Sequence, residues 1–61
     1  MPRVIIQAVE GRSDDQKRAL VKSVTDAVVM AYGVEPKTVT IVIEDIARSN
    51  FAKAGVLASD G

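Results

Sequence analysis

The residues that could catalyse a reaction are few, because the chain contains neither Cys nor His. Cysteine nucleophiles, histidine bases and the triads built from them are therefore excluded. Disulfides and the best zinc ligands are absent as well. What remains are carboxylates, lysines, arginines, hydroxyls, Tyr32 and one unusual group at the start of the chain, Pro2.

Pro2 allows two interpretations. Proline has no backbone N–H for a sheet ladder, so Pro2 could simply begin a strand made by the apolar run behind it. If Met1 is removed, however, Pro2 carries a free secondary amine, an ionisable group that no internal proline has. Local sequence alone leaves both interpretations open.

Arg12 is the second residue without an obvious structural reason. It directly precedes a predicted helix start, where the helix dipole disfavours a positive charge. Arg12 and the free N–H groups of that helix start could together bind a carboxylate. Alternatively, Arg12 pairs with Glu10 or Asp14 at the surface.

The other polar side chains favour structural roles. Asp14 and Asp15 suit a helix start, and Glu44 is the carboxylate with the weakest structural explanation. We interpret Tyr32 as a packing residue. The four lysines are predicted to be solvated: Lys17, Lys22, Lys37 and Lys53.

Three elements must position these residues. Arg3 to Val9 is predicted to be a strand that is apolar on both faces, so that both faces should be covered. Ser13 to Gln16 reads as a capping box that opens a helix from Asp14 to Tyr32, and Gly33 ends it. The helix has a stripe of apolar residues at helical spacing: Leu20, Val21, Val24, Ala27, Val28 and Ala31. Asp14 and Arg18 are spaced to pair on its outer face.

The rest of the chain completes one α/β (α+β) unit. Val39 to Asp45 is predicted to be a second strand, parallel to the first in a right-handed βαβ crossover. Ile46 to Phe51 reads as a loop, and the residues after it as a short hairpin that turns at Gly55. We expect a single domain over residues 1–61.

Size and charge indicate what the chain binds. A domain of 61 residues has a marginal core, and 48% hydrophobic residues suggest that some apolar surface is hidden between subunits. Eight basic and eight acidic residues cancel, there is no basic run, and only two residues are aromatic, so nucleic acid is not an expected partner. No segment resembles a membrane span or a signal peptide. We therefore expect an oligomeric cytoplasmic protein.

Three segments resemble the 4-oxalocrotonate tautomerase family: the opening MPRVII, the EGRSDDQK loop and helix start, and NFAKAG. The resemblance covers nearly the whole chain. It implies a short βαβ subunit, assembly as a homo-oligomer, commonly a hexamer built as a trimer of dimers, and proline as the first residue of the mature chain. It also implies a keto-enol tautomerase that needs no metal or organic cofactor and acts on a small unsaturated 2-hydroxy or 2-oxo acid such as 2-hydroxymuconate.

The resemblance also implies roles for single residues. Pro2 matches the catalytic base, Arg12 the arginine that holds a substrate carboxylate, and Phe51 the aromatic residue that keeps the site apolar. Apolar surroundings and a nearby arginine would both lower the pKa of the Pro2 amine, which suits a general base. The family's second arginine falls on Thr40, which has no charge. From Thr40 we expect weak binding of a second carboxylate and little preference for diacids over monoacids.

Two alternatives remain. The chain could be a hydratase or dehalogenase of the same superfamily, although no carboxylate is clearly placed to activate water. It could also be a subunit of low activity in a hetero-oligomer whose partner supplies the missing arginine.

Overall fold

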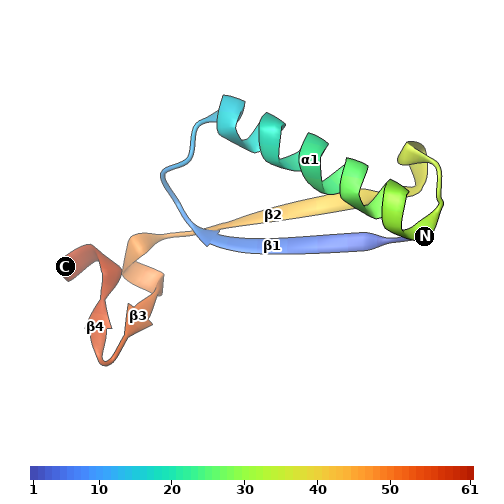
Figure 1. The fold of residues 1–61 in the computed structure, drawn as a ribbon. Coiled ribbons are helices and arrows are strands. Elements are labelled where there is room, and N and C mark those ends of the chain that lie inside the picture. Colours follow the sequence, from blue (N-terminus) through green and yellow to red (C-terminus); the bar gives the residue numbers. More distant parts are fainter.

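The fold is built around a sheet of two parallel strands (Figure 1). The structure is a computed structural model that describes all residues 1–61. Strand β1 spans Arg3–Val9 and strand β2 spans Thr40–Ile46. Their register runs from Arg3 opposite Thr40 to Val9 opposite Ile46. The predicted βαβ unit is confirmed, with β2 beginning and ending one residue later than predicted.

A single helix, α1 (Asp14–Tyr32), connects the two strands. The predicted capping box is present: the Gln16 N–H donates to the Ser13 hydroxyl at 3.2 Å, and the Ser13 N–H donates to the Gln16 side chain at 2.9 Å. Gly33 ends the helix in the left-handed conformation, with φ of 66°, and its N–H donates to the Val29 carbonyl. Arg18 pairs with Asp15 at 2.7 Å rather than with Asp14 as predicted, because residues three apart on a helix are also neighbours.

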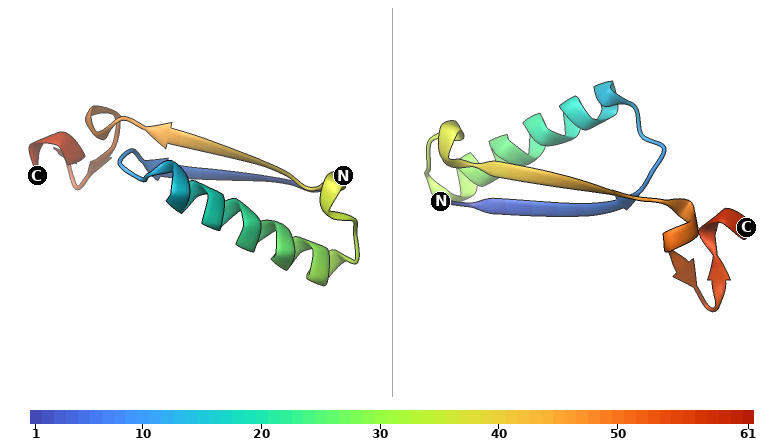
Figure 2. Two further views of the ribbon diagram at one scale, coloured as in Figure 1. Left: turned by 90° about the horizontal axis from the view of Figure 1, so that it is seen from above. Right: turned by 180° about the vertical axis from the view of Figure 1, so that it is seen from behind.

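Helix α1 covers one face of the sheet (Figure 2). Val21, Val24 and Val28 are half-buried, whereas Leu20 stays 40% exposed at the margin of the covered stripe. Two strands make a sheet only about 10 Å wide, so they cannot cover the whole apolar stripe. Residues of α1 that the sheet does not cover line two open hollows, one near each end of the helix.

The opposite face of the sheet has nothing packed on it. Ile5 is 56% exposed and Val42 41%, and these two residues are cross-strand neighbours. Beside them the Gln7 amide donates to Glu44 at 2.8 Å. An apolar sheet face open to water is unusual in a stable monomer, which agrees with the expectation that another subunit covers it.

After β2 the chain leaves the βαβ unit as a separate arm (Figure 1). The predicted loop contains one turn of 3₁₀ helix, Arg48–Asn50, and the predicted hairpin consists of β3 (Ala52–Lys53) and β4 (Val56–Leu57). Ala54 and Gly55 form its turn with φ values of 53° and 81°, the signature of a tight hairpin turn. A further 3₁₀ turn, Ala58–Asp60, ends the arm.

The overall shape is extended. No residue is buried, and the molecule measures 43 × 22 × 13 Å with a radius of gyration of 14.6 Å. A compact domain of this length would have a radius of gyration of about 10.5 Å. The chain thus lacks an interior of its own, as expected of a subunit. No helix is long and apolar enough to cross a membrane.

Candidate active site

Pro2 lies at the amino end of the sheet, one residue before β1. Its carbonyl accepts two hydrogen bonds from Thr40, one from the backbone N–H at 3.0 Å and one from the hydroxyl at 3.4 Å. Both use the Pro2 oxygen, so the missing N–H costs the ladder nothing at this position. Pro2 therefore directly precedes the strand and is held against Thr40 through its carbonyl.

Beside Pro2 is a hollow of about 410 Å³ between the start of β1 and the end of α1. Its walls come from both elements: Pro2, Arg3, Val4, Ala27, Val28, Ala31 and Tyr32. Most of these residues are apolar. Apolar surroundings of this kind disfavour the charged form of an amine.

Arg12 lies at the other end of the sheet, in the loop that joins β1 to α1. It pairs with neither Glu10 nor Asp14 and forms no other ion pair or side-chain hydrogen bond. Glu10 instead accepts the Arg48 backbone N–H at 3.0 Å. Of the two interpretations of Arg12, the local ion pair is therefore wrong, and its guanidinium is free to bind a ligand.

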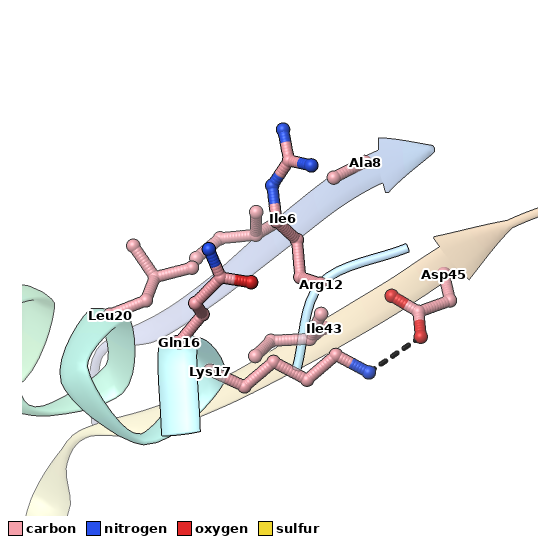
Figure 3. A pocket seen from close by; sticks show the side chains of 8 residues that line it. All are labelled: Ile6, Ala8, Arg12, Gln16, Lys17, Leu20, Ile43 and Asp45. Carbon is pink, nitrogen blue, oxygen red and sulfur yellow. Dashed lines mark hydrogen bonds and ion pairs between the residues drawn. The ribbon is translucent and has the colours of Figure 1, made fainter. Parts of the chain in front are cut away.

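Arg12 stands over a hollow of about 260 Å³ whose floor is formed by Ile6, Leu20 and Ile43 (Figure 3). At the edge of this hollow Lys17 donates to Asp45 at 2.6 Å, joining α1 to β2. This hydrogen bond raises the pKa of Lys17 above its usual 10.5. Lys17 is half-buried and paired, so its prediction as a solvated lysine is wrong.

Phe51 follows β2 and is 44% exposed. It lines a hollow of about 460 Å³ together with Arg48, Lys53 and the residues of the hairpin. The Arg48 guanidinium donates to the Ala58 carbonyl at 2.8 Å and closes this arm on itself. Phe51 thus lies beyond the carboxyl end of the sheet, on the projecting arm.

The structure does not bring the three predicted site residues together within one chain. Pro2 precedes β1 and Arg12 follows it, and a strand of this length spans about 23 Å. Because the strands are parallel, Phe51 lies beyond the same end of the sheet as Arg12. A site that uses all three residues needs at least two copies of the chain.

Other candidate groups are occupied by structural contacts. Glu44 accepts the Gln7 amide, and Asp26 pairs with Lys22 at 3.2 Å. No group of three or more acidic side chains lies close enough together to hold a metal ion. Sequence reasoning missed the contact between Thr40 and Pro2, because no sequence pattern reveals which residues face each other across a parallel sheet.

Comparison with known proteins agrees with this fold and with the resemblance. The family model described as "Tautomerase enzyme" matches residues 2–61. The 2-hydroxymuconate tautomerase of Bacillus subtilis strain 168 is 40% identical over 60 residues, which cover 98% of this chain and 97% of that protein.

Solved structures share the same fold. YwhB, a homologue of 4-oxalocrotonate tautomerase, superimposes with a TM-score of 0.90 at 38% identity over 98% of both chains. A chain of the heterohexameric 4-oxalocrotonate tautomerase from Chloroflexus aurantiacus J-10-fl reaches a TM-score of 0.90 at 25% identity, over 98% of this chain and 97% of that one.

The fold and the match over residues 2–61 identify a small βαβ protein of the tautomerase superfamily. The chain belongs to the tautomerase family, and its relatives include 4-oxalocrotonate and 2-hydroxymuconate tautomerases.

Proposed function

We propose that this chain is a subunit of a cofactor-independent keto-enol tautomerase that acts on small unsaturated 2-hydroxy or 2-oxo acids, with 2-hydroxymuconate as the leading candidate. Pro2 is its general base once Met1 has been removed. The observation that carries the proposal is the combination of Pro2 beside an apolar hollow with an arginine, Arg12, that no residue of the chain neutralises.

The reaction needs one base that can also return a proton. The neutral Pro2 nitrogen takes the proton of the 2-hydroxyl group, and the electron pair of that O–H bond forms the 2-oxo group. The conjugated double bonds shift, and the protonated amine delivers the proton to a carbon further along the chain. No atom is gained or lost, and no electron leaves the substrate.

Arg12 and Phe51 support this transfer in the proposed site. Arg12 binds a substrate carboxylate through a forked guanidinium and stabilises the negative charge that develops on the conjugated system. Phe51 excludes water from the site, which favours the neutral form of the Pro2 amine. The lower local dielectric constant also strengthens the attraction between Arg12 and the negatively charged substrate.

We further propose that the site forms between copies of the chain in a homo-hexamer. The separation of Pro2 from Arg12 along β1 supports this assembly, as do the open sheet face at Ile5 and Val42 and the extended shape. The 4-oxalocrotonate tautomerase of Chloroflexus aurantiacus J-10-fl, one chain of which superimposes on this one, is a heterohexamer, and this supports an assembly of six chains.

The test begins with the intact mass of the purified protein, which shows whether Met1 is absent. Ketonisation of 2-hydroxymuconate changes its ultraviolet absorbance, and this gives the rate. For Pro2→Ala we expect a kcat/KM at least about 100-fold lower, the usual contribution of a positioned general base. Equal rates for Pro2→Ala and the wild type, in preparations that both lack Met1, would sink the role of Pro2.

A second candidate rests on Thr40, which leaves the position of the family's second arginine without a charge. In that case the chain is one subunit of a hetero-oligomer and has low activity alone. Turnover by the purified single chain at a rate ordinary for an enzyme, about 1 per second or more, rejects this candidate. A hydratase or dehalogenase has less support, because Glu44 is engaged by Gln7.

A further inference from the structure

One unpaired cation lies at the Pro2 end of the sheet. Of the eight basic side chains, four pair with carboxylates and a fifth binds a backbone carbonyl: Lys17, Arg18, Lys22, Lys37 and Arg48. The remaining three are Arg3, Arg12 and Lys53. Arg12 and Lys53 lie at or beyond the carboxyl end of the sheet, so Arg3 is the only unpaired cationic side chain at the amino end.

The register places Arg3 directly opposite Thr40. Facing residues of neighbouring strands lie about 5 Å apart, and their side chains stand on the same face of the sheet. This is the open face, since the next pairs along it are Ile5 with Val42 and Gln7 with Glu44. Thr40 is short and uncharged, and its hydroxyl is turned to the Pro2 carbonyl.

No carboxylate of the chain competes for Arg3. The nearest acidic side chain on that face, Glu44, lies two cross-strand pairs further along and accepts the Gln7 amide. A guanidinium without an anionic partner, next to the proposed base, is therefore available to an anionic ligand.

We propose that Arg3 is a specificity-determining residue that binds the second carboxylate of a diacid substrate. This inference rests on the proposed function, in which Arg12 binds one carboxylate and Pro2 moves the proton. Thr40 on β2 occupies the position of the family's second arginine but has no charge. Arg3, which lies opposite it on β1, provides the positive charge instead. The enzyme prefers diacids, contrary to the expectation drawn from Thr40 alone.

The experiment compares two substrates that differ at one end only: 2-hydroxymuconate, and 2-hydroxyhexa-2,4-dienoate, in which a methyl group replaces the distal carboxylate. For Arg3→Ala we expect the ratio of kcat/KM for the diacid to that for the monoacid to fall at least about tenfold, the usual loss for one charge-assisted hydrogen bond. Most of the fall should appear in KM, because the lost contact lies away from the bonds that change.

The matched control is Arg18→Ala, which removes the same charge from the outer face of α1, where Arg18 pairs with Asp15. We expect its substrate ratio to equal that of the wild type. A second variant exchanges the two facing residues, Arg3→Thr with Thr40→Arg, and keeps composition and net charge. It should restore most of the diacid preference, since the guanidinium moves only one strand spacing, about 5 Å.

Two results overturn the inference: a wild type without diacid preference, or an Arg3→Ala variant whose ratio stays within about twofold of the wild type. Neither affects the proposed function as long as Pro2→Ala still removes activity on both substrates. If Pro2→Ala is as active as the wild type, the proposed function fails instead. If thermal unfolding and elution volume show that Arg3→Ala does not fold, the same ratio of kcat/KM is measured for Arg3→Gln and for the exchanged variant, and the same criteria apply.

Discussion

At the scale of single residues, Arg12 is the side chain whose position is hardest to explain by folding. It lies beside the positive end of the α1 dipole, which disfavours a cation, and no carboxylate of the chain offsets its charge. A residue that is unfavourable for its own helix and free of partners is more easily explained by a ligand. The proposed carboxylate contact supplies that ligand.

For Arg12→Ala we expect kcat/KM to fall about 100-fold, the cost of a forked ionic contact in a site shielded from water. Arg12→Lys should recover only part of this loss, because an ammonium group cannot form the forked contact. Thermal unfolding of both variants should match the wild type, since Arg12 makes no contact that stabilises the fold. Unchanged kinetics in Arg12→Ala would remove Arg12 from the site.

At the scale of elements, the pair of Lys17 and Asp45 fastens the first turn of α1 to the end of β2. The pair is only partly exposed, with 29% of the Lys17 side chain accessible. Both residues border the hollow below Arg12 (Figure 3). The Asp45 hydrogen bond is the largest cause of the raised pKa of Lys17.

This pair should give a stability difference that depends on pH. Because folding raises the pKa of Lys17 above 10.5, the pair stabilises the native state fully below that pH and loses its effect as the pH rises through the raised value. Lys17→Met should therefore have a lower Tm than the wild type at neutral pH, and the gap should narrow above pH 10.5. Lys22→Met, which breaks an exposed helix pair, is the control with little expected effect. If the difference in Tm between the wild type and Lys17→Met does not change with pH, the ion pair of Lys17 and Asp45 is not the source of the stabilisation.

At the scale of the whole molecule, the isolated chain is incomplete in three respects. It has no buried residue, one face of its sheet is open, and its proposed site residues lie at opposite ends of β1. All three are resolved if the open sheet faces of two copies pack together, with the amino end of one sheet beside the carboxyl end of the other. In a closed symmetric assembly this contact repeats for every copy.

Mixing inactive variants tests whether the site is shared. Pro2→Ala and Arg12→Ala should each be nearly inactive alone. When the two are unfolded together, refolded at equal amounts and assayed, activity should return at about a quarter of the sites, the fraction in which an intact Pro2 meets an intact Arg12 from another copy. The matched control mixes the variants after separate refolding, without exchange of subunits. No recovery in the refolded mixture, despite mixed oligomers, would show that each site belongs to a single chain.

The elements and their order follow from local signals in the sequence. The capping box at Ser13, the stop at Gly33 and the β-branched runs on either side of the helix are local signals, and they placed β1, α1 and the hairpin turn where the structure has them. The boundaries of β2 and the partners of Arg18 and Lys17 differed, because they depend on neighbours that local patterns do not specify.

Which residues lie next to one another depends on how these elements pack in three dimensions. The parallel register brought Thr40 to Pro2 and Arg3 to Thr40, and it separated Pro2 from Arg12 by the full length of β1. A strand's own sequence shows which face each side chain takes, because side chains alternate along it. It does not show which residue of the other strand lies opposite, since that depends on how the connecting helix packs on the sheet.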